Sequence, residues 1–225
     1  TITLTNKGYL PYTDNLLKSI KKNSSELKPT ICVMDNYSEN YYKKKNYDVY
    51  LVDNLNNKKF LKQDSKDFGS YMISKIKIIN YFLSNNEKIL YMDGDIVVKN
   101  NFLNYLNKKI SNKDMLIQND LNPDKPEIEY LCAGFMAIKS NNKTLDFFNL
   151  DNIPVEKIMT GLHDQGYINE NKELLNYEIL PLDLFPNGPH YYNNKDSIDP
   201  NIIHFNYVVG NKKKKLMKKY GEWYL

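Results

Sequence analysis

The middle of the chain reads Ile89-Leu90-Tyr91-Met92-Asp93-Gly94-Asp95-Ile96-Val97-Val98. The apolar run before the two aspartates, bounded by polar residues, is typical of a buried strand. Because ligands of an α/β sheet bind outside the carboxyl ends of its strands, Asp93 and Asp95 would stand at a binding edge. Two carboxylates one residue apart can hold Mg²⁺ or Mn²⁺, whose other ligands are usually phosphate oxygens and water. The pattern predicts a metal–diphosphate site, with an ordinary Asp-Gly-Asp turn as the alternative.

The composition is that of an ordinary globular protein. The 225 residues are 41% hydrophobic and 26% charged, with a net charge of +4, which fits one large α/β domain. No apolar run reaches the roughly 18 to 20 residues that span a bilayer, and the N-terminus lacks a signal-peptide core. Cys32 and Cys132 both lie in apolar, strand-like runs, which favours buried free thiols over a disulfide. We therefore expect a cytoplasmic, reducing environment and no membrane span.

Apolar runs and helical stripes alternate along the chain. The clearest helix covers residues 71–83, where Met72, Ile76, Ile79 and Leu83 form one stripe. Prolines punctuate a stretch from Pro181 that we expect to be rich in loops. The other predicted helices are 14–22, 144–150 and 164–171, and the predicted strands are 2–5, 30–34, 47–52, 89–92, 115–118, 131–138, 177–180 and 202–204. This alternation predicts βαβ units and a mostly parallel central sheet flanked by helices.

Two features near the C-terminus could complete a metal–diphosphate site. His204 ends the predicted strand 202–204, and Mn²⁺ accepts imidazole together with carboxylate ligands. A buried histidine with satisfied hydrogen bonds is the alternative. The lysine-rich segment 212–219 follows, and lysines beside a metal-bound diphosphate would neutralise the leaving group. Without such a ligand, a run of charges is usually a solvated face.

A helix start is predicted at Gly161-Leu162-His163-Asp164-Gln165-Gly166. Asp164 could cap this helix by accepting backbone N–H bonds. Its functional alternative is to bind sugar hydroxyls or to stabilise a cationic sugar centre, as carboxylates do in glycosyl chemistry.

The order of these motifs resembles that of GT-A-fold glycosyltransferases, especially the glycogenin-like and galactosyltransferase-C-like enzymes and the wider nucleotide-diphospho-sugar transferases. The resemblance covers nearly the whole chain and rests on residues 90–98, on Asp164-Gln165-Gly166 with Asn169, and on His204-Phe205. It implies one Rossmann-like GT-A domain over residues 1–225. The nucleotide-sugar-binding half would cover about 1–98 and the acceptor-binding half about 99–225.

The resemblance also implies a role for each motif. Asp93, Asp95 and His204 would hold Mn²⁺ or Mg²⁺ against the diphosphate, while Asp164 and Gln165 would act as catalytic residues at the donor sugar. A catalytic lysine is expected in the helix 71–83. Alignment without gaps selects Lys77, whereas the helical stripe selects Lys75. The residues expected to bind the nucleotide sugar are Thr3, Thr5, Asn6, Tyr9 (its ring on the base), Asp93, Gly94, Gly134, His163, Asn206, Gly210 and Lys213.

The resulting prediction is a metal-dependent glycosyltransferase. It would move a sugar from a nucleoside-diphosphate sugar, in first place a UDP-sugar, to a hydroxyl on a glycan or protein, with retention. Inversion stays open, with Asp164 or Asp183 as the base. Residues 119–129 and 185–197 are the expected acceptor loops.

Two alternative functions remain at this stage. A nucleotidyltransferase acting on sugar phosphates would need a Gly-rich basic loop after the first strand, where the chain has Asn6-Lys7-Gly8-Tyr9. A non-catalytic carbohydrate- or nucleic-acid-binding module would use the lysine-rich segment 212–219, with strongly salt-dependent binding. We expect no nucleic-acid partner.

Overall fold

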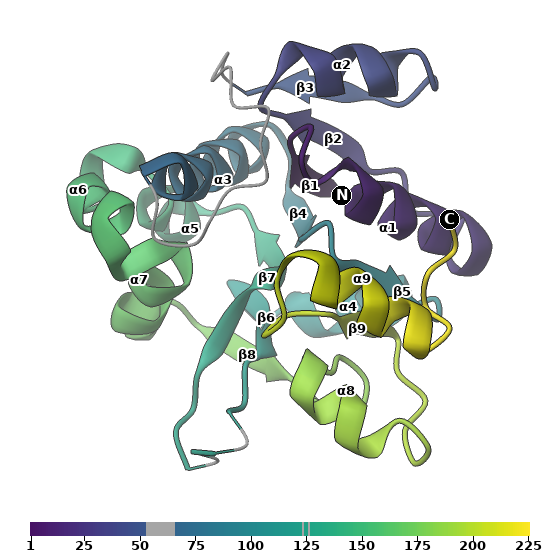
Figure 1. The fold of residues 1–225 in the computed structure, drawn as a ribbon. Helices are drawn as coiled ribbons and strands as arrows, with labels where there is room; N and C mark the ends of the chain where they lie inside the picture. Colours follow the sequence, from purple (N-terminus) through teal and green to yellow (C-terminus); the bar gives the residue numbers. More distant parts are fainter. Residues whose placement is uncertain (53–65, 123, 126) are drawn as a thin grey trace.

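A seven-stranded sheet forms the centre of the computed structural model, which describes residues 1–52, 66–122, 124–125 and 127–225. The strand order is β3-β2-β1-β4-β7-β6-β8 (Figure 1). All pairs are parallel except those of β7, which runs antiparallel to β4 and β6. The predicted mostly parallel sheet is therefore confirmed. The strands are β1 (Ile2–Thr5), β2 (Thr30–Val33), β3 (Val49–Leu51), β4 (Lys88–Met92), β6 (Met115–Asn119), β7 (Leu131–Lys139) and β8 (Tyr177–Leu180).

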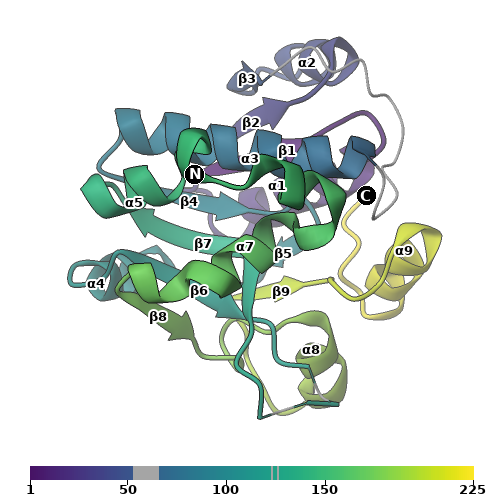
Figure 2. The same cartoon turned by 90° about the vertical axis from the view of Figure 1, so that its left-hand side faces the viewer.

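Helices cover both faces of this sheet. One face carries α3 (Lys66–Asn85), α5 (Asn142–Phe147), α6 (Val155–Lys157) and α7 (His163–Asn171), which lie in front of the sheet in Figure 2. The other face packs against α1 (Leu10–Asn23) and α4 (Leu103–Ile110). Short helical turns at Leu150–Asn152, Ile158–Leu162 and Lys172–Leu174 connect the helices around α7.

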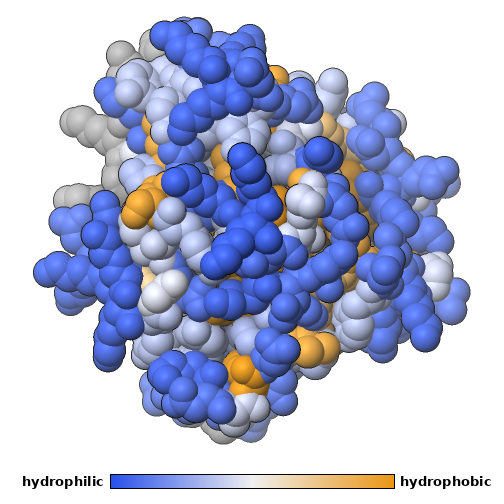
Figure 3. Space-filling view, turned by 90° about the vertical axis from the view of Figure 1, so that its right-hand side faces the viewer, coloured by the Kyte–Doolittle hydropathy of each residue, from blue (hydrophilic) through white to orange (hydrophobic). Residues whose placement is uncertain are grey.

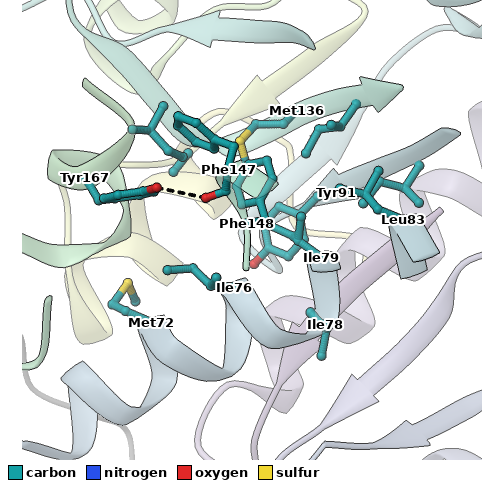
Figure 4. Close-up of a cluster of buried hydrophobic side chains, with 14 of the residues drawn as sticks. Met72, Ile76, Ile78, Ile79, Leu83, Tyr91, Met136, Phe147, Phe148 and Tyr167 are labelled. Atoms are coloured by element: carbon teal, nitrogen blue, oxygen red, sulfur yellow. Dashed lines mark hydrogen bonds between the residues drawn. The ribbon is translucent and has the colours of Figure 1, made fainter. Parts of the chain in front are cut away.

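The stripe predicted on the helix 71–83 forms the main core. Met72, Ile76, Ile79 and Leu83 are buried against residues of β4, β7, α5 and α7 (Figure 4). In the same cluster the Tyr167 hydroxyl donates a hydrogen bond to the Phe147 carbonyl at 2.8 Å, which satisfies its polar end. Burial of one such aliphatic side chain contributes about 1.5 to 3 kcal/mol, so the stripe fixes α3 on the sheet. The position of α3 on the sheet determines where the Lys75 side chain points.

A second, two-stranded sheet holds the aspartates in place. β5 (Ile96–Val98) pairs antiparallel with β9 (Ile202–His204), and Ile96 lies opposite His204. The Asp93 N–H donates to the Gly134 carbonyl of β7 at 2.8 Å. The turn that carries the two aspartates is thus held at one end by the large sheet and at the other by β9. The pairing with β9 places His204 beside them, although about 110 residues separate these positions in the chain.

The register of β7 is irregular beside this turn. Ile117 of β6 pairs with Met136, whereas the next residue, Gln118, pairs with Cys132. Residues 133–135 therefore have no partner in β6, and the alternation of faces along β7 changes there. Such irregularities re-aim side chains and are frequent next to active sites. Cys132 and Gly134 both face His204 as a result.

Five α-helices of the described ranges were not predicted from the sequence: α2 (Asn36–Lys43), α4, α6, α8 (Gly188–Asn194) and α9 (Gly210–Lys219). The expectation of loops after Pro181 is wrong for α8. There the Asn187 side chain accepts from the His190 N–H at 3.0 Å, and Pro189 occupies the first turn, where no N–H is needed. The same effect lets α1 begin at Leu10, four residues before the predicted start, because Pro11 lies in its first turn.

The C-terminal segment packs back onto α1. The Asn15 side chain donates to the Glu222 carbonyl at 2.9 Å and accepts from the Tyr224 N–H at 2.6 Å. Figure 3 shows the face on which the C-terminus lies, where hydrophilic residues cover most of the surface and apolar patches are small. Within the described ranges, no helix has the length and apolar character that crossing a bilayer requires.

Candidate active site

Three predicted metal ligands converge on one point. His204 Nε2 lies 3.3 Å from Asp95 Oδ1 and 3.9 Å from Asp93 Oδ2. One ligand atom from each residue can be chosen so that all lie within 4.8 Å of one another. Asp95 and His204 are buried, and Asp93 is partly exposed. Two carboxylate oxygens and one imidazole nitrogen are a donor set that Mn²⁺ accepts, so these residues fit the implied ion.

Gln118 determines which nitrogen of His204 faces the carboxylates. Its amide nitrogen donates to the carbonyls of Phe185 and Pro186, at 3.0 and 2.9 Å, so its oxygen must point the other way. That oxygen lies 2.8 Å from His204 Nδ1 and accepts its proton. In the neutral imidazole that binds a metal ion, the Nε2 lone pair is consequently aimed at the aspartates. Gln118 was not a sequence candidate.

Charges around the triad shift two pKa values. Burial alone would raise the pKa of Asp95, but the Lys213 ammonium and His204 hold it well below its usual range. Burial alone would lower the pKa of His204, but the Cys132 sulfur and Asp95 raise it well above its usual value. The Cys132 Sγ lies 3.5 Å from His204 Nδ1. The carboxylate of Asp95 is thus kept ionised, which is the form that binds a cation.

Two glycines leave the space in which these side chains meet. A Cβ on Gly134 would lie 2.2 Å from His204 Cε1 and 2.8 Å from Asp93 Oδ2. A Cβ on Gly94, between the aspartates, would lie 2.7 Å from Thr13 Oγ1 and 3.1 Å from the Tyr9 ring. Close approach of the backbone to other groups is a common reason for glycine. At Gly134 the bare backbone lies against the metal triad itself.

Lys75 connects the triad to Asp164. Its Nζ lies 2.8 Å from Asp164 Oδ2, 3.5 Å from Asp93 Oδ1, and 4.6 Å from the centre of the Tyr91 ring. The Tyr91 hydroxyl donates to Asp93 Oδ1 at 2.6 Å and so holds the same carboxylate. Burial lowers the pKa of Lys75, but Asp164 and Asp93 outweigh this and raise it. Lys77 is exposed, on another side of α3, so the geometry favours the lysine chosen by the helical stripe.

An unusual turn before α7 places Asp164 next to Lys75. Gly161 has a φ of 137°, and His163, at the start of α7, has φ 58° and ψ 170°. A non-glycine residue in this region costs about 1 to 3 kcal/mol and persists only where its surroundings enforce it. The His163 ring packs edge-on against Phe68, with centroids 5.2 Å apart. Asp164 lies in the first turn of α7, and its carboxylate pairs with Lys75.

Asp120, at the carboxyl end of β6, organises a polar network on the far side of the triad. Its Oδ2 accepts from Gln165 Nε2 at 2.9 Å, and its Oδ1 accepts from Asn206 Nδ2 at 2.8 Å. Gln165 Oε1 in turn accepts from the Ala133 N–H at 3.1 Å. The predicted residues Gln165 and Asn206 are therefore brought together by a carboxylate that the sequence analysis missed. A lone Asp after a strand carried no distinguishing pattern.

Lys213 is the buried lysine of the basic helix α9. Its ammonium pairs with Asp95 Oδ2 and donates to the Tyr9 hydroxyl at 3.0 Å. Lys213 and Met217 are buried, whereas Lys212, Lys215, Lys218 and Lys219 are exposed. One lysine of the charge run thus enters the site, where its contact with a diphosphate stays a prediction, and the exposed lysines form a solvated face.

The remaining predicted contacts lie on the α1 side of the triad. The Tyr9 ring lies tilted against Tyr12, with centroids 4.8 Å apart. Asn6 Oδ1 accepts from the Tyr9 N–H at 3.1 Å. Thr3 and Thr5 are fully buried, and Thr5 Oγ1 accepts from Thr13 Oγ1 at 2.9 Å. Their side chains are therefore not open to solvent in this arrangement, and their contact with a nucleotide stays a prediction.

Two other predicted positions lie outside this cluster. Gly210 has a φ of 58° at the start of α9, and its carbonyl accepts from the Tyr12 hydroxyl at 2.8 Å. Asp183, the second candidate base, is largely exposed and pairs with His190 Nε2 at 2.8 Å, away from the triad. Of the expected acceptor segments, 185–197 contains α8, and 119–129 includes positions 123 and 126, which lie outside the described residues.

The fold is shared with solved glycosyltransferase structures. A crystal structure of an active-site mutant of LgtC superposes with a TM-score of 0.65 at 12% identity, covering 98% of this chain and 94% of that one. The galactosyltransferase LgtC with donor and acceptor sugar analogues gives 0.63 at 11% identity, covering 100% and 96%. The glycosyltransferase GlyE of Streptococcus pneumoniae TIGR4 gives 0.62 at 13% identity, covering 100% and 59%. The predicted GT-A fold is confirmed by these likenesses.

Sequence comparison identifies the family. A UDP-galactose:fucoside alpha-3-galactosyltransferase of Dictyostelium discoideum is 30% identical over 174 residues. The match covers 64% of this chain but about a quarter of that relative, 26% of its length. The family model described as nucleotide-diphospho-sugar transferase matches residues 27–218, which is most of the chain. With the fold and the converging Asp93, Asp95 and His204, this match shows that the chain belongs to the nucleotide-diphospho-sugar transferase family.

Proposed function

We propose that the protein is a metal-dependent glycosyltransferase that moves a sugar from a UDP-sugar to a hydroxyl acceptor with retention of configuration. The observation that carries this proposal is the convergence of Asp93, Asp95 and His204 Nε2 next to two buried lysines. Family membership supports a nucleotide-sugar donor. The name of the Dictyostelium relative pairs UDP-galactose with an α product and a fucoside acceptor, which supports UDP as the nucleotide and a sugar as the acceptor.

Asp93, Asp95 and His204 would hold Mn²⁺, or Mg²⁺ in its place. Once bound there, the ion would neutralise charge on the diphosphate as it departs. Lys213 reaches the same point from α9 and would add a second positive charge to the phosphate side. Asp95, which pairs with Lys213 in this structure, would then contact both the metal ion and the Lys213 ammonium, because a carboxylate has lone pairs for more than one contact.

Lys75 would act on the sugar side as a charge between two carboxylates. Its contacts to Asp93 and Asp164 would hold the two carboxylates at a fixed separation. Asp164 is buried, and with Gln165 it stands at the start of α7, where it would face the donor sugar and a developing positive charge on it. The division of the chain near residue 98 and the reducing location suggested by free Cys32 and Cys132 remain parts of this proposal.

Calorimetric titration of UDP with and without Mn²⁺ tests the donor half. We expect micromolar binding that requires the metal and weakens about 100-fold or more in Asp95→Asn, because loss of a supporting partner alone costs 10- to 100-fold. Asp196→Asn is the matched control, since this carboxylate is 88% exposed. A panel of UDP-sugars then identifies the donor by slow hydrolysis, and NMR of the product gives its anomeric configuration. Equal UDP binding with and without metal, or in Asp95→Asn, would refute the proposal.

A further inference from the structure

Two ion pairs of opposite polarity connect β5 with the last helix, α9. Asp95, the residue before the first of β5, pairs with Lys213 near the start of α9. Lys99, the residue after the last of β5, pairs with Glu222, which lies shortly after the end of α9, with Lys99 Nζ 2.6 Å from Glu222 Oε1. The first pair belongs to the candidate active site. Lys99 and Glu222 form an outer pair at the other end of both elements.

β5 and α9 also share apolar packing. Val97 in the middle of β5 and Met217 of α9 are both fully buried in the same hydrophobic cluster. Such packing is not directional, so it does not by itself fix which way the helix points. The two ion pairs do, because an α9 turned end for end would place lysine against lysine and carboxylate against carboxylate. Their opposite polarity therefore selects the orientation in which Lys213 reaches Asp95.

Glu222 is the firmly anchored member of the outer pair. Its side chain is only 5% exposed, and its carboxylate accepts from the hydroxyls of Tyr191 at 3.4 Å and Tyr224 at 3.0 Å. Its backbone N–H donates to the Met217 carbonyl at 2.8 Å, and its own carbonyl accepts from Asn15 at 2.9 Å. One residue thus joins α1, α8 and the end of α9 to the strand that follows the metal-binding aspartates.

We propose that Glu222 is a positioning residue that holds the Lys213 ammonium at the phosphate side of the metal triad. It acts at a distance, through α9 and β5, because its carboxylate contacts Lys99, Tyr191 and Tyr224. Fixing the two elements in advance reduces the ordering that a bound ligand would otherwise have to impose on the long lysine side chain. This inference rests on the proposed function, in which Lys213 contacts the diphosphate.

Glu222→Gln tests this role without leaving a buried charge unpaired. Glutamine can still accept from both tyrosines, and Lys99, with 30% of its side chain exposed, keeps its contact with solvent. Calorimetry should show about 10-fold weaker binding of UDP in the presence of Mn²⁺, because a displaced Lys213 no longer meets the phosphates. The affinity for Mn²⁺ alone should fall by less than about twofold, because none of the three ligands is changed. Glu178→Gln, which breaks an exposed pair with Lys109, is the control and should change neither affinity.

A double variant separates positioning from a general loss of structure. In a Lys213→Met background, Glu222→Gln should change UDP binding by less than about twofold, because the residue that it positions is gone. A general loosening of the fold would instead lower the UDP and Mn²⁺ affinities together, in either background.

Three results would overturn the role of Glu222. They are an equal loss of UDP and Mn²⁺ affinity in Glu222→Gln, no loss of either, and an undiminished effect in the Lys213→Met background. Absence of UDP binding to the unmodified protein would instead overturn the proposed function. In that event, acetylation of the lysines, followed by mass spectrometry, decides about positioning alone. Buried Lys213 should react slowly in the unmodified protein and in Glu178→Gln, and at least about 10-fold faster in Glu222→Gln, whereas equal protection in all three refutes the positioning.

Discussion

Gly134→Ala should weaken the metal site although it replaces none of the ligands. The added Cβ would lie 2.2 Å from His204 Cε1, whereas carbon atoms in contact are about 3.5 to 4.0 Å apart. The imidazole or the strand must therefore move by at least about 1.3 Å. His204 cannot rotate away freely, because it is buried and its Nδ1 is bound to Gln118. The tolerance of a metal–ligand distance is only about 0.2 Å.

The expected magnitude follows from these distances. Displacing one ligand should lower Mn²⁺ affinity at least 10- to 100-fold, the range seen when a supporting partner is lost, which corresponds to about 1.4 to 2.7 kcal/mol. Overpacking of a closed site should also cost about 1 to 3 kcal/mol of unfolding free energy. Calorimetric titration of Mn²⁺ in the presence of UDP measures the first effect, and urea unfolding without metal measures the second.

Gly166→Ala provides the matched control for this prediction. Its added Cβ would approach the tip of the Leu162 side chain at 2.9 Å, which can rotate away, and the residue lies within α7. Exchange of glycine for alanine in a helix stabilises by about 0.5 to 1 kcal/mol. The same exchange of glycine for alanine should thus lower the free energy of unfolding at position 134 and raise it at position 166. Unchanged metal affinity and unchanged stability in Gly134→Ala would refute the convergence of His204 and Asp93 on this backbone position.

Three further substitutions test other contacts of the site. Lys75→Met should cost about 3 to 5 kcal/mol of unfolding free energy, because it leaves the buried Asp164 carboxylate without its cation. Lys77→Met should change this free energy by less than about 0.5 kcal/mol, and urea unfolding measures both variants. Gln118→Leu should lower Mn²⁺ affinity about 10- to 100-fold by releasing His204, and equal affinity in a paramagnetic titration would argue against the assigned tautomer. His163→Gly should be about 1 to 3 kcal/mol more stable than His163→Ala, since both lose the ring but only glycine relieves the backbone; equal melting curves would contradict this.

The parts of the site that the sequence could predict are those with a local pattern. The apolar run before Asp93, the stripe on α3 and the strand before His204 each mark a position within a few residues. The antiparallel pairing of β5 with β9, which brings His204 to the aspartates, was not predicted from the sequence. The stripe favoured Lys75 over Lys77 as the lysine near the packed face, because residues two apart lie on different sides of a helix, and a catalytic role for either lysine stays a prediction.

The remaining parts depend on long-range contacts that leave no local pattern. Gln118 looks like any polar residue at the end of a strand, and its role comes from two carbonyls that lie 67 and 68 residues away in the chain. Asp120 is defined by partners 45 and 86 residues away. Helix α8 was hidden because its proline was interpreted as a break, although a proline is compatible with a first helical turn.

The irregular register of β7 divides the strand into an inner half, which pairs with β4, and an outer end, which borders the metal ligands. Leu131 and Ala133 face the same core as Met136 and Ile138, whereas Phe135 and Ala137 face the opposite core. In a regular strand, gain or loss of one residue moves every following side chain to the other face. Here the inner half of β7 keeps its register through its pairing with β4, from Met92 opposite Phe135 to Lys88 opposite Lys139. The change of face lets the outer end place Cys132 and Gly134 against the metal ligands while Leu131 and Ala133 remain in the core.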